Sequence, residues 1–225
     1  MTPIRAVVFD LDGLMFNTED VYWHVGSELL RRRGRVFTRE LSDAMMGLPP
    51  RPSFEVMIGW HSLNDTWEDL AAESETIYFD LLDQHVAPMP GLFELLDAVE
   101  TAGLPKAICT SSRRITLDAL LSRFGLESRF EFALTAEDIV RGKPHPEIYL
   151  KAAAKLGIEP GEMLVLEDSQ AGCRAAAAAG AFAVAVPGDH SRNHDFCAAS
   201  LQIEGLGDPR LYAVLGLPAP PKPSG

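Results

Sequence analysis

The hydrophobic pattern of the chain predicts strands that alternate with helices. The β-branched run at residues 6–9 is typical of a buried strand, and short apolar runs of the same kind recur in the second half of the chain. We expect strands at residues 6–9, 107–109, 131–134, 163–166 and 182–186, and helices at 92–101, 117–124, 146–156 and 171–179. This alternation predicts a doubly wound α/β fold, in which a mainly parallel sheet carries helices on both faces.

The segment between the first strand and residue 89 differs, because its apolar residues follow helical spacing. Examples are Leu41 with Met45, Phe54 with Met57 and Ile58, and Leu70 with Ile77 and Leu81. The run Pro88-Met89-Pro90-Gly91 marks the end of the segment. We therefore predict an inserted α-helical cap domain at residues 18–88. Residues 1–17 and 89–225 would then form one Rossmann-like core.

Composition places the chain among globular proteins, with 47% hydrophobic and 23% charged residues. A net charge of −12 argues against nucleic-acid binding, because Lys and Arg are too few to replace phosphate counterions. Three cysteines without CxxC spacing suit a reducing compartment. The sequence has no apolar run long enough for a signal peptide or a membrane span. We expect a cytoplasmic protein with neither nucleic acid nor membrane as partner; its oligomeric state is not indicated.

Polar side chains follow four of the predicted strands, at the edge where open parallel sheets bind ligands. The set comprises four carboxylates, a pair of hydroxyl residues and one lysine. In chain order these are Asp10 and Asp12, Thr110 and Ser111, Lys143, and Glu167 with Asp168. Since the carboxyl ends of parallel strands share one edge, we expect these side chains to form an active site.

The charges of this set fit phosphoryl transfer. Each close pair of carboxylates costs roughly 4 kcal/mol at an effective dielectric constant near 20. A hard divalent cation such as Mg²⁺ relieves that repulsion by binding carboxylate oxygens. The same cation and the Lys143 ammonium would offset the repulsion between an attacking carboxylate and a phosphate dianion. A covalent intermediate would divide the very slow hydrolysis of a phosphomonoester into two steps.

The motifs Asp10-Leu11-Asp12-Gly13, Thr110, Lys143-Pro144 and Glu167-Asp168, in this order, resemble those of the haloacid dehalogenase-like superfamily. They are most similar to the subfamily with a helical cap, which contains small-molecule phosphatases and β-phosphoglucomutase. The resemblance extends over nearly the whole chain, including residues 141–146 and the alanine-rich helix that follows residue 168.

The resemblance implies a catalytic role for several residues. Asp10 would be the nucleophile, and Asp12 would act first as general acid for the leaving group and then as general base for water. Thr110 and Lys143 would bind the phosphate, and the backbone amide of Ser111 would add a further donor.

The resemblance also implies an Mg²⁺ site. The carboxylates of Asp10 and Asp168 and the main-chain carbonyl of Asp12 would bind the ion, and Glu167 would act directly or through water. In the cap, Arg51 is a candidate to contact a second anionic group of the substrate, the alternative being an ordinary surface arginine.

Two positions bear on the choice between a phosphatase and a mutase. The β-phosphoglucomutases characteristically have a histidine near the place of Tyr22 and an arginine at that of Pro50. Both differences favour transfer to water, so we expect a phosphatase acting on a small phosphorylated metabolite such as a sugar phosphate. A phosphosugar mutase is the alternative, followed by a catalytically silent metabolite-binding protein. Asn17 stands where many relatives have Asp, and its effect on cap closure is open.

Overall fold

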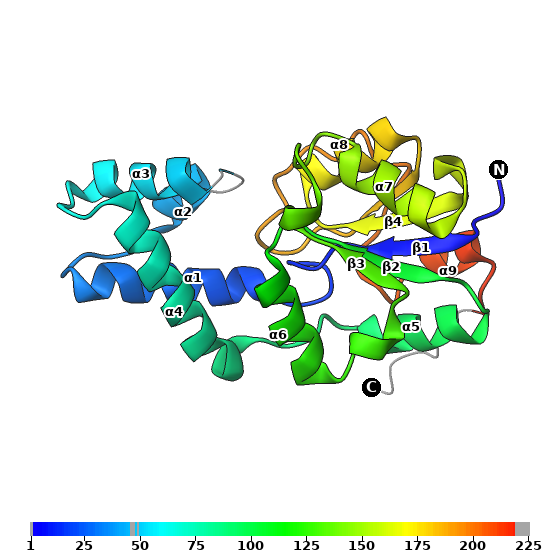
Figure 1. Cartoon of the computed structure of the whole chain (residues 1–225), viewed down its shortest axis with the longest axis horizontal. Coiled ribbons are helices and arrows are strands. Elements are labelled where there is room, and N and C mark those ends of the chain that lie inside the picture. Colours follow the sequence, from blue (N-terminus) through cyan, green and yellow to red (C-terminus); the bar gives the residue numbers. More distant parts are fainter. Residues whose placement is uncertain (1, 46–47, 49, 219–225) are drawn as a thin grey trace. The chain divides into compact units, whose positions relative to one another are not determined.

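The computed structural model describes residues 2–45, 48 and 50–218 (Figure 1). Clustering of the chain separates two compact units. One comprises Met1–Phe16 together with Pro88–Gly225 and is called the core unit here; the other is Asn17–Ala87, called the cap unit. The boundaries lie within one residue of those expected from the change in hydrophobic pattern.

The core unit contains a parallel sheet whose strand order is β3-β2-β1-β4-β5-β6. The strands are β1 (Ala6–Phe9), β2 (Lys106–Cys109), β3 (Phe132–Leu134), β4 (Met163–Glu167), β5 (Phe182–Ala185) and β6 (Leu201–Gln202). The predicted doubly wound α/β fold is thereby confirmed. Strand β6 was not expected, because two residues are too few to produce a recognisable hydrophobic pattern.

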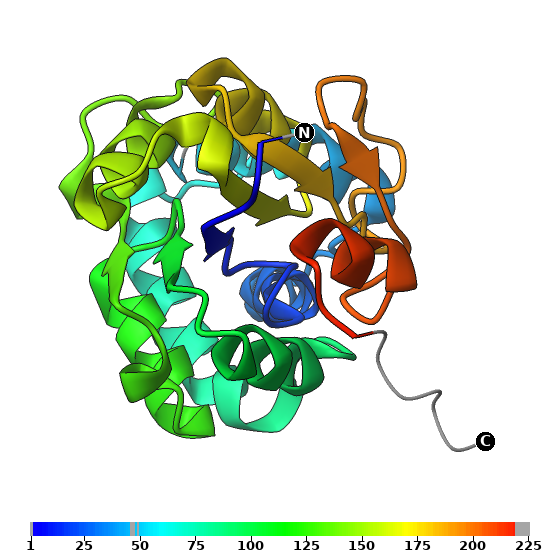
Figure 2. The same ribbon diagram turned by 90° about the vertical axis from the view of Figure 1, so that its right-hand side faces the viewer.

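Helices cover both faces of this sheet, with α7 and α8 on one side and α5 and α9 on the other (Figures 1 and 2). The core helices are α5 (Leu92–Thr101), α6 (Arg114–Phe124), α7 (Glu147–Leu156), α8 (Gln170–Ala179) and α9 (Pro209–Leu215), with short 3₁₀ turns at Glu127–Arg129, Ala136–Asp138 and Pro160–Glu162. On the α7–α8 side, Val8, Cys109 and Val165 pack against the small side chains Ala152 and Ala176. Alternate strand residues face the other layer, as the pleat of a strand requires.

The junction between β4 and α8 is closely packed. Ser169 is the N-cap of α8; its hydroxyl accepts a hydrogen bond from the Gly172 amide and donates one to Glu167 Oε2, both at 3.0 Å. Gly172 faces Glu167, which is fully buried. A Cβ atom at Gly172 would lie 1.8 Å from Glu167 Oε1. Glycine is therefore required for this helix to begin beside this carboxylate.

The cap unit is built from α1 (Thr18–Arg32), α2 (Arg39–Met45), α3 (Pro50–His61) and α4 (Trp67–His85), as the helical spacing predicts. Its interior is formed mainly by α1 and α4. Apolar residues of both helices are buried there: Val21, Val25, Leu29 and Leu30 from α1, and Leu70, Ile77 and Leu82 from α4.

The two ends of the cap unit are joined by hydrogen bonds of Asn17. Its amide N–H donates to the Ala87 carbonyl at 3.1 Å, and the Ala87 N–H donates to Asn17 Oδ1 at 2.6 Å. Asn17 Nδ2 also donates to the His85 carbonyl at 3.2 Å. An aspartate could accept from Ala87 but could not donate to His85, so the asparagine uses both halves of its amide. In the core unit, the neighbouring Phe16 and Pro88 form an isolated antiparallel bridge.

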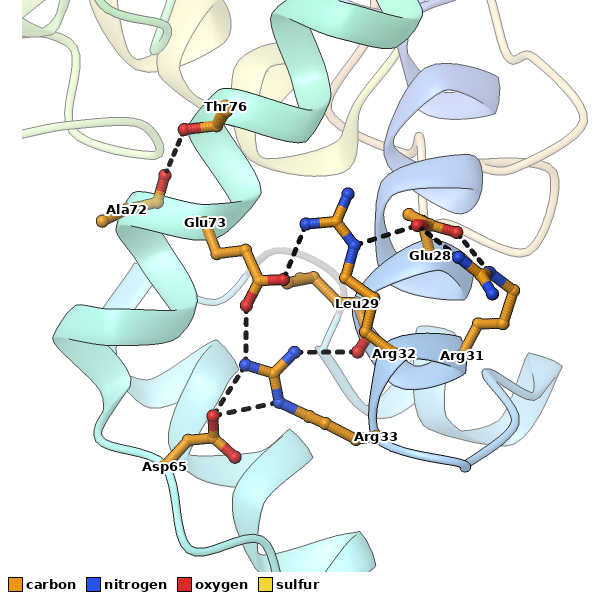
Figure 3. A network of polar contacts seen from close by, with 9 residues as sticks. All are labelled: Glu28, Leu29, Arg31, Arg32, Arg33, Asp65, Ala72, Glu73 and Thr76. Carbon is orange, nitrogen blue, oxygen red and sulfur yellow. Dashed lines mark hydrogen bonds and ion pairs between the residues drawn. The ribbon is translucent and has the colours of Figure 1, made fainter.

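Arg33, directly after α1, links that helix to α4 and to the segment before it (Figure 3). Its guanidinium donates to Asp65 Oδ1 and to Glu73 Oε2, in each case at 2.6 Å, and to the Leu29 carbonyl at 2.9 Å. The Arg33 side chain is only 17% exposed. Hydrogen bonds from Arg33 lower the pKa of both Asp65 and Glu73. By contrast, Arg31 is 72% exposed and pairs with Glu28 of its own helix.

We predict that Arg33→Ala lowers the free energy of unfolding by about 1–2 kcal/mol at pH 7, because two partly buried carboxylates lose charged donors. Since folding lowers the pKa of Asp65 and Glu73, this stabilisation is present above their unfolded-state pKa values, near 4, and is lost as the pH falls through the folded-state values. Urea denaturation at pH 7 and at decreasing pH measures the difference. Arg31→Ala is the control and should scarcely move the midpoint. Equal effects of the two changes would contradict the prediction.

A second prediction concerns glycine in two helices. Alanine is the better helix former by roughly 1 kcal/mol. At Gly59 of α3, no atom of the described residues beyond its own helix backbone and chain neighbours lies within 4 Å of the place of a Cβ. Gly59→Ala should therefore raise the thermal unfolding temperature. Gly172→Ala should lower stability by about 1–3 kcal/mol, because the buried Glu167 carboxylate must be displaced. If Gly172→Ala also raised the stability, the β4–α8 junction would be able to move aside for a Cβ atom, and the prediction for Gly172 would be wrong.

Candidate active site

The site lies at the carboxyl edge of the sheet, between β1 and β4. From β1 the chain leads to β2 and β3 on one side, and it later returns to form β4, β5 and β6 on the other. Such a reversal of strand order opens a crevice at the strand ends. Asp10 directly follows β1, and its amide donates to the Leu166 carbonyl of β4 at 3.0 Å. Glu167 is the last residue of β4, so the two carboxylates are brought to neighbouring strand ends.

The Lys143 ammonium is the centre of the site. Nζ donates to Asp10 Oδ1 at 2.5 Å, to Glu167 Oε1 at 2.6 Å and to the Cys109 carbonyl at 3.0 Å. Its side chain is 5% exposed. Burial alone would lower the pKa of Lys143, but the charges of Asp10 and Glu167 raise it above its usual value. Lys143 is therefore a permanent cation in a nearly dry environment.

The surroundings of Asp10 disfavour the ionised form of its carboxyl group. Burial raises the pKa of Asp10 to about 8; Lys143 opposes the shift, while Glu167 and Asp12 add to it. One oxygen each of Asp10, Glu167 and Asp168 lie within 4.8 Å of one another. Gly13, with φ of 74°, brings the backbone so near that a Cβ there would lie 2.4 Å from Asp168 Oδ2. This buried set of carboxylate oxygens fits a hard divalent cation, which would offset the excess negative charge.

Asp12 is held by two hydroxyl groups. Ser112 Oγ donates to Asp12 Oδ2 at 2.6 Å, and Thr110 Oγ1 donates to the same oxygen at 3.2 Å. The Ser112 amide in turn donates to Thr110 Oγ1 at 2.9 Å, which orients that hydroxyl. The other oxygen, Oδ1, is buried and has no hydrogen-bond partner within the described part of the chain. Asp12 thus has a fixed carboxylate with one oxygen left for proton exchange.

The structure brings together the predicted residues of the core unit. Lys143 links Asp10 to Glu167, Thr110 contacts Asp12, and Asp168 joins Asp10 and Glu167 in the carboxylate cluster. Ser111 is exposed, and a role for its amide stays a prediction.

Arg51 belongs to the cap unit. It is exposed, forms an ion pair with Glu55 at 2.8 Å and lies over the Trp67 ring at 5.9 Å. Its contact with substrate also stays a prediction. Of the four residues that precede Arg51, Gly47 and Pro49 lie outside the described residues.

Sequence reasoning missed two residues of the site. Ser112, which bonds to Asp12, could have been found from the hydroxyl run Thr110-Ser111-Ser112. The hydroxyl of Tyr149 donates to Glu167 Oε1 at 2.6 Å. Burial raises the pKa of Tyr149, and the charge of Glu167 raises it further, so the hydroxyl keeps its proton. In the sequence Tyr149 has the pattern of a core residue of α7, with no signal of this contact.

Comparisons with known proteins agree with this geometry. Residues 7–186 match the model of the haloacid dehalogenase-like hydrolase family. The chain is 29% identical to the phosphorylated carbohydrates phosphatase of Thermotoga maritima, over 79% of this chain and 82% of that protein. It is also 29% identical to a fructose-1-phosphate phosphatase of Escherichia coli, over 80% and 95% of the two chains.

Among solved structures, the chain is similar to a hydrolase of this family from Deinococcus radiodurans R1 with bound phosphate and sodium. The TM-score is 0.79 and the identity 28%, with 96% of this chain and 99% of that chain covered.

Within the described residues, no helix combines the length and the apolar character needed to cross a membrane. The expected enzyme class, a phosphohydrolase, is confirmed. Because the model of this family matches residues 7–186, which is most of the sequence, the chain belongs to the haloacid dehalogenase-like hydrolase family.

Proposed function

We propose that the protein is an Mg²⁺-dependent phosphatase that hydrolyses a small phosphorylated metabolite, such as a sugar phosphate, through an aspartyl-phosphate on Asp10. The observation that carries the proposal is the buried contact of the Lys143 ammonium with Asp10 and Glu167, beside Asp168. This arrangement offers a nucleophile, a cation and a set of hard oxygen ligands in one place. Two relatives named as phosphatases of carbohydrate phosphates support the substrate class.

The metal site would use residues at the ends of two neighbouring strands, β1 and β4. Asp10, Asp168 and the main-chain carbonyl of Asp12 would hold Mg²⁺, with Glu167 acting directly or through water. When bound, the ion supplies positive charge beside the phosphoryl oxygens and keeps the Asp10 carboxylate ionised. This matters because burial raises the pKa of Asp10 to about 8 in the protein alone.

The reaction then follows from the side chains. The Asp10 carboxylate forms a bond to phosphorus while the ester P–O bond breaks, and Asp12 donates a proton to the departing oxygen. Lys143 and Thr110 bind the phosphoryl oxygens as their charge develops. In the second step Asp12 accepts a proton from water, whose oxygen attacks the same phosphorus. The bond between Asp10 and phosphorus breaks and phosphate leaves, so that Asp10 is again a carboxylate and Asp12 is again a carboxylic acid. Ser112 holds Asp12 in place throughout by its hydrogen bond to Oδ2.

The cap unit would select the substrate, with Arg51 as a candidate contact for a second anionic group. The residues that bear on mutase activity, Tyr22 and Pro50, are partly exposed, and Tyr22 stacks on Tyr78 with ring centroids 5.0 Å apart. With Tyr22 and Pro50 at the places where β-phosphoglucomutases characteristically have a histidine and an arginine, net hydrolysis is the function we propose.

We predict that the protein releases phosphate from members of a panel of phosphorylated metabolites with Mg²⁺ present, and that EDTA abolishes this release. Asp10→Asn should be inactive, because the amide is not a nucleophile and binds the metal poorly. It should be at least as stable as wild type without metal, since one charge of the buried carboxylate cluster is removed. In wild type with Mg²⁺, trifluoroberyllate should attach to Asp10 and be visible by fluorine NMR.

Two outcomes would contradict this prediction. Substantial turnover by Asp10→Asn would exclude the covalent mechanism. Hexose 6-phosphate appearing from a hexose 1-phosphate before free phosphate would show that the protein is a mutase.

The role of Asp12 as general acid can be tested with phosphate esters that differ in their leaving group. Asp12→Asn should lose far more activity on alkyl phosphates, which need a proton on the departing oxygen, than on aryl phosphates with good leaving groups. Metal affinity should be largely retained, because the proposed ligand is the main-chain carbonyl. Steady-state kinetics on the two ester classes and calorimetric metal titration measure these effects. Equal losses on both classes would make Asp12 a structural residue.

A further inference from the structure

Tyr149 contacts the charged centre of the site, yet the proposed reaction gives it no task. It lies on α7 and is fully buried. Its hydroxyl donates to Glu167 Oε1 at 2.6 Å, and the same oxygen accepts from Lys143 Nζ at 2.6 Å. The Lys143 ammonium is also 5.3 Å from the centroid of the Tyr149 ring. Tyr149 therefore contacts both residues of the ion pair that lies next to Asp10.

The hydrogen bonds of Glu167 are saturated by the protein itself. A carboxylate has about four lone-pair positions. Oε1 accepts from Lys143 and Tyr149, and Oε2 accepts from the Ser169 hydroxyl at 3.0 Å and the Ser169 amide at 3.3 Å. Gly172 closes the remaining side, since even a Cβ there would collide with the carboxylate. Glu167 is thus fixed in one orientation with all its acceptor positions in use.

This saturation matters because Asp10 and Glu167 compete for Lys143. Nζ is bonded to one oxygen of each, at 2.5 and 2.6 Å. The Tyr149 hydroxyl supplies Glu167 Oε1 with a second donor, which reduces the attraction that this oxygen exerts on the ammonium. Without that donor, Glu167 Oε1 would have a free position in a buried site, where an unmade hydrogen bond is costly. The carboxylate could then draw Lys143 away from Asp10 or turn towards a metal.

We infer that Tyr149 is a positioning residue, which together with Ser169 fixes Glu167 so that Glu167 orients Lys143 on Asp10 and does not itself bind the metal. The inference rests on the proposed phosphatase function. It assigns Glu167 one role in that function, which is to orient Lys143. Tyr149 is fully buried and contacts Glu167 and Lys143, so its effect on the reaction would pass through these two residues.

The chain offers a matched control in Tyr212 of α9. Tyr212 is 2% exposed, and its hydroxyl has no hydrogen-bond partner within the described residues. Tyr149→Phe and Tyr212→Phe each remove one phenolic oxygen from a buried ring of the core unit. Both variants keep the ring that fills the interior, so both should fold. Differences between them therefore report the contact with Glu167.

The experiment compares wild type and the two variants in phosphate release, in Mn²⁺ binding by calorimetry and in binding of inorganic phosphate to the Mn²⁺-loaded protein. Residues that orient an active group typically contribute about 10–100-fold, so Tyr149→Phe should lower kcat/KM at least about tenfold and weaken phosphate binding, while its Mn²⁺ dissociation constant changes by less than about threefold. Tyr212→Phe should change none of these quantities.

Two results would overturn the inference. If Tyr149→Phe behaves like Tyr212→Phe, the hydroxyl serves packing alone. If Mn²⁺ affinity falls by the same factor as kcat/KM, Glu167 is a metal ligand and Tyr149 acts through the metal. A wild-type protein that hydrolyses no phosphate ester would refute the proposed function instead. In that case the comparison of Mn²⁺ and phosphate binding still tests Tyr149.

Discussion

The buried ammonium group of Lys143 is the interaction on which the site depends. Two carboxylates with almost no exposure, Asp10 and Glu167, each bond to it within 2.6 Å. Burial of an ion is costly unless it is paired and hydrogen-bonded, and loss of the lysine would leave both carboxylates uncompensated. The lysine thus makes the carboxylate cluster compatible with a folded core. The amino end of α8 adds to this, since the amide and the hydroxyl of its N-cap residue Ser169 both donate to Glu167 beside the positive end of the helix dipole.

Parallel topology explains how residues far apart in the chain meet at this ammonium group. Lys143 and Asp10 are separated by 133 positions, and Thr110 lies 98 positions from Asp12. With the strand order β3-β2-β1-β4-β5-β6, the first and fourth strands are neighbours at the centre of the sheet. Their carboxyl ends are then adjacent without any specific long-range contact between loops. The sheet therefore determines which groups meet, and the loops adjust distances.

The fold and the main residues of the site could be predicted because their signals are local. A β-branched run followed by Asp10 and Asp12 indicates both a strand and its functional end, and the same holds for Glu167 and Asp168. Ser112 and Tyr149 were missed because their importance depends on which hydroxyl reaches which carboxylate, and hydrophobic spacing carries no such information. Helix α6 begins at Arg114, earlier than expected, and no side chain caps it, so its start left little trace in the sequence.

The hydrogen bonds of Asn17 bear on how the inserted helices could be exchanged during evolution. Its bonds to residues 85 and 87 tie the entry and exit of the helical insertion into a single hydrogen-bonded stem. The free energy of closing a loop rises by only about 0.6 kcal/mol for each doubling of its length. An insertion held at its base can therefore grow, shrink or be exchanged while the register of the sheet is kept. Such a stem makes the helical insertion a replaceable module, so that a different set of helices could be grafted between the same two ends while the strand ends that carry the candidate site keep their places.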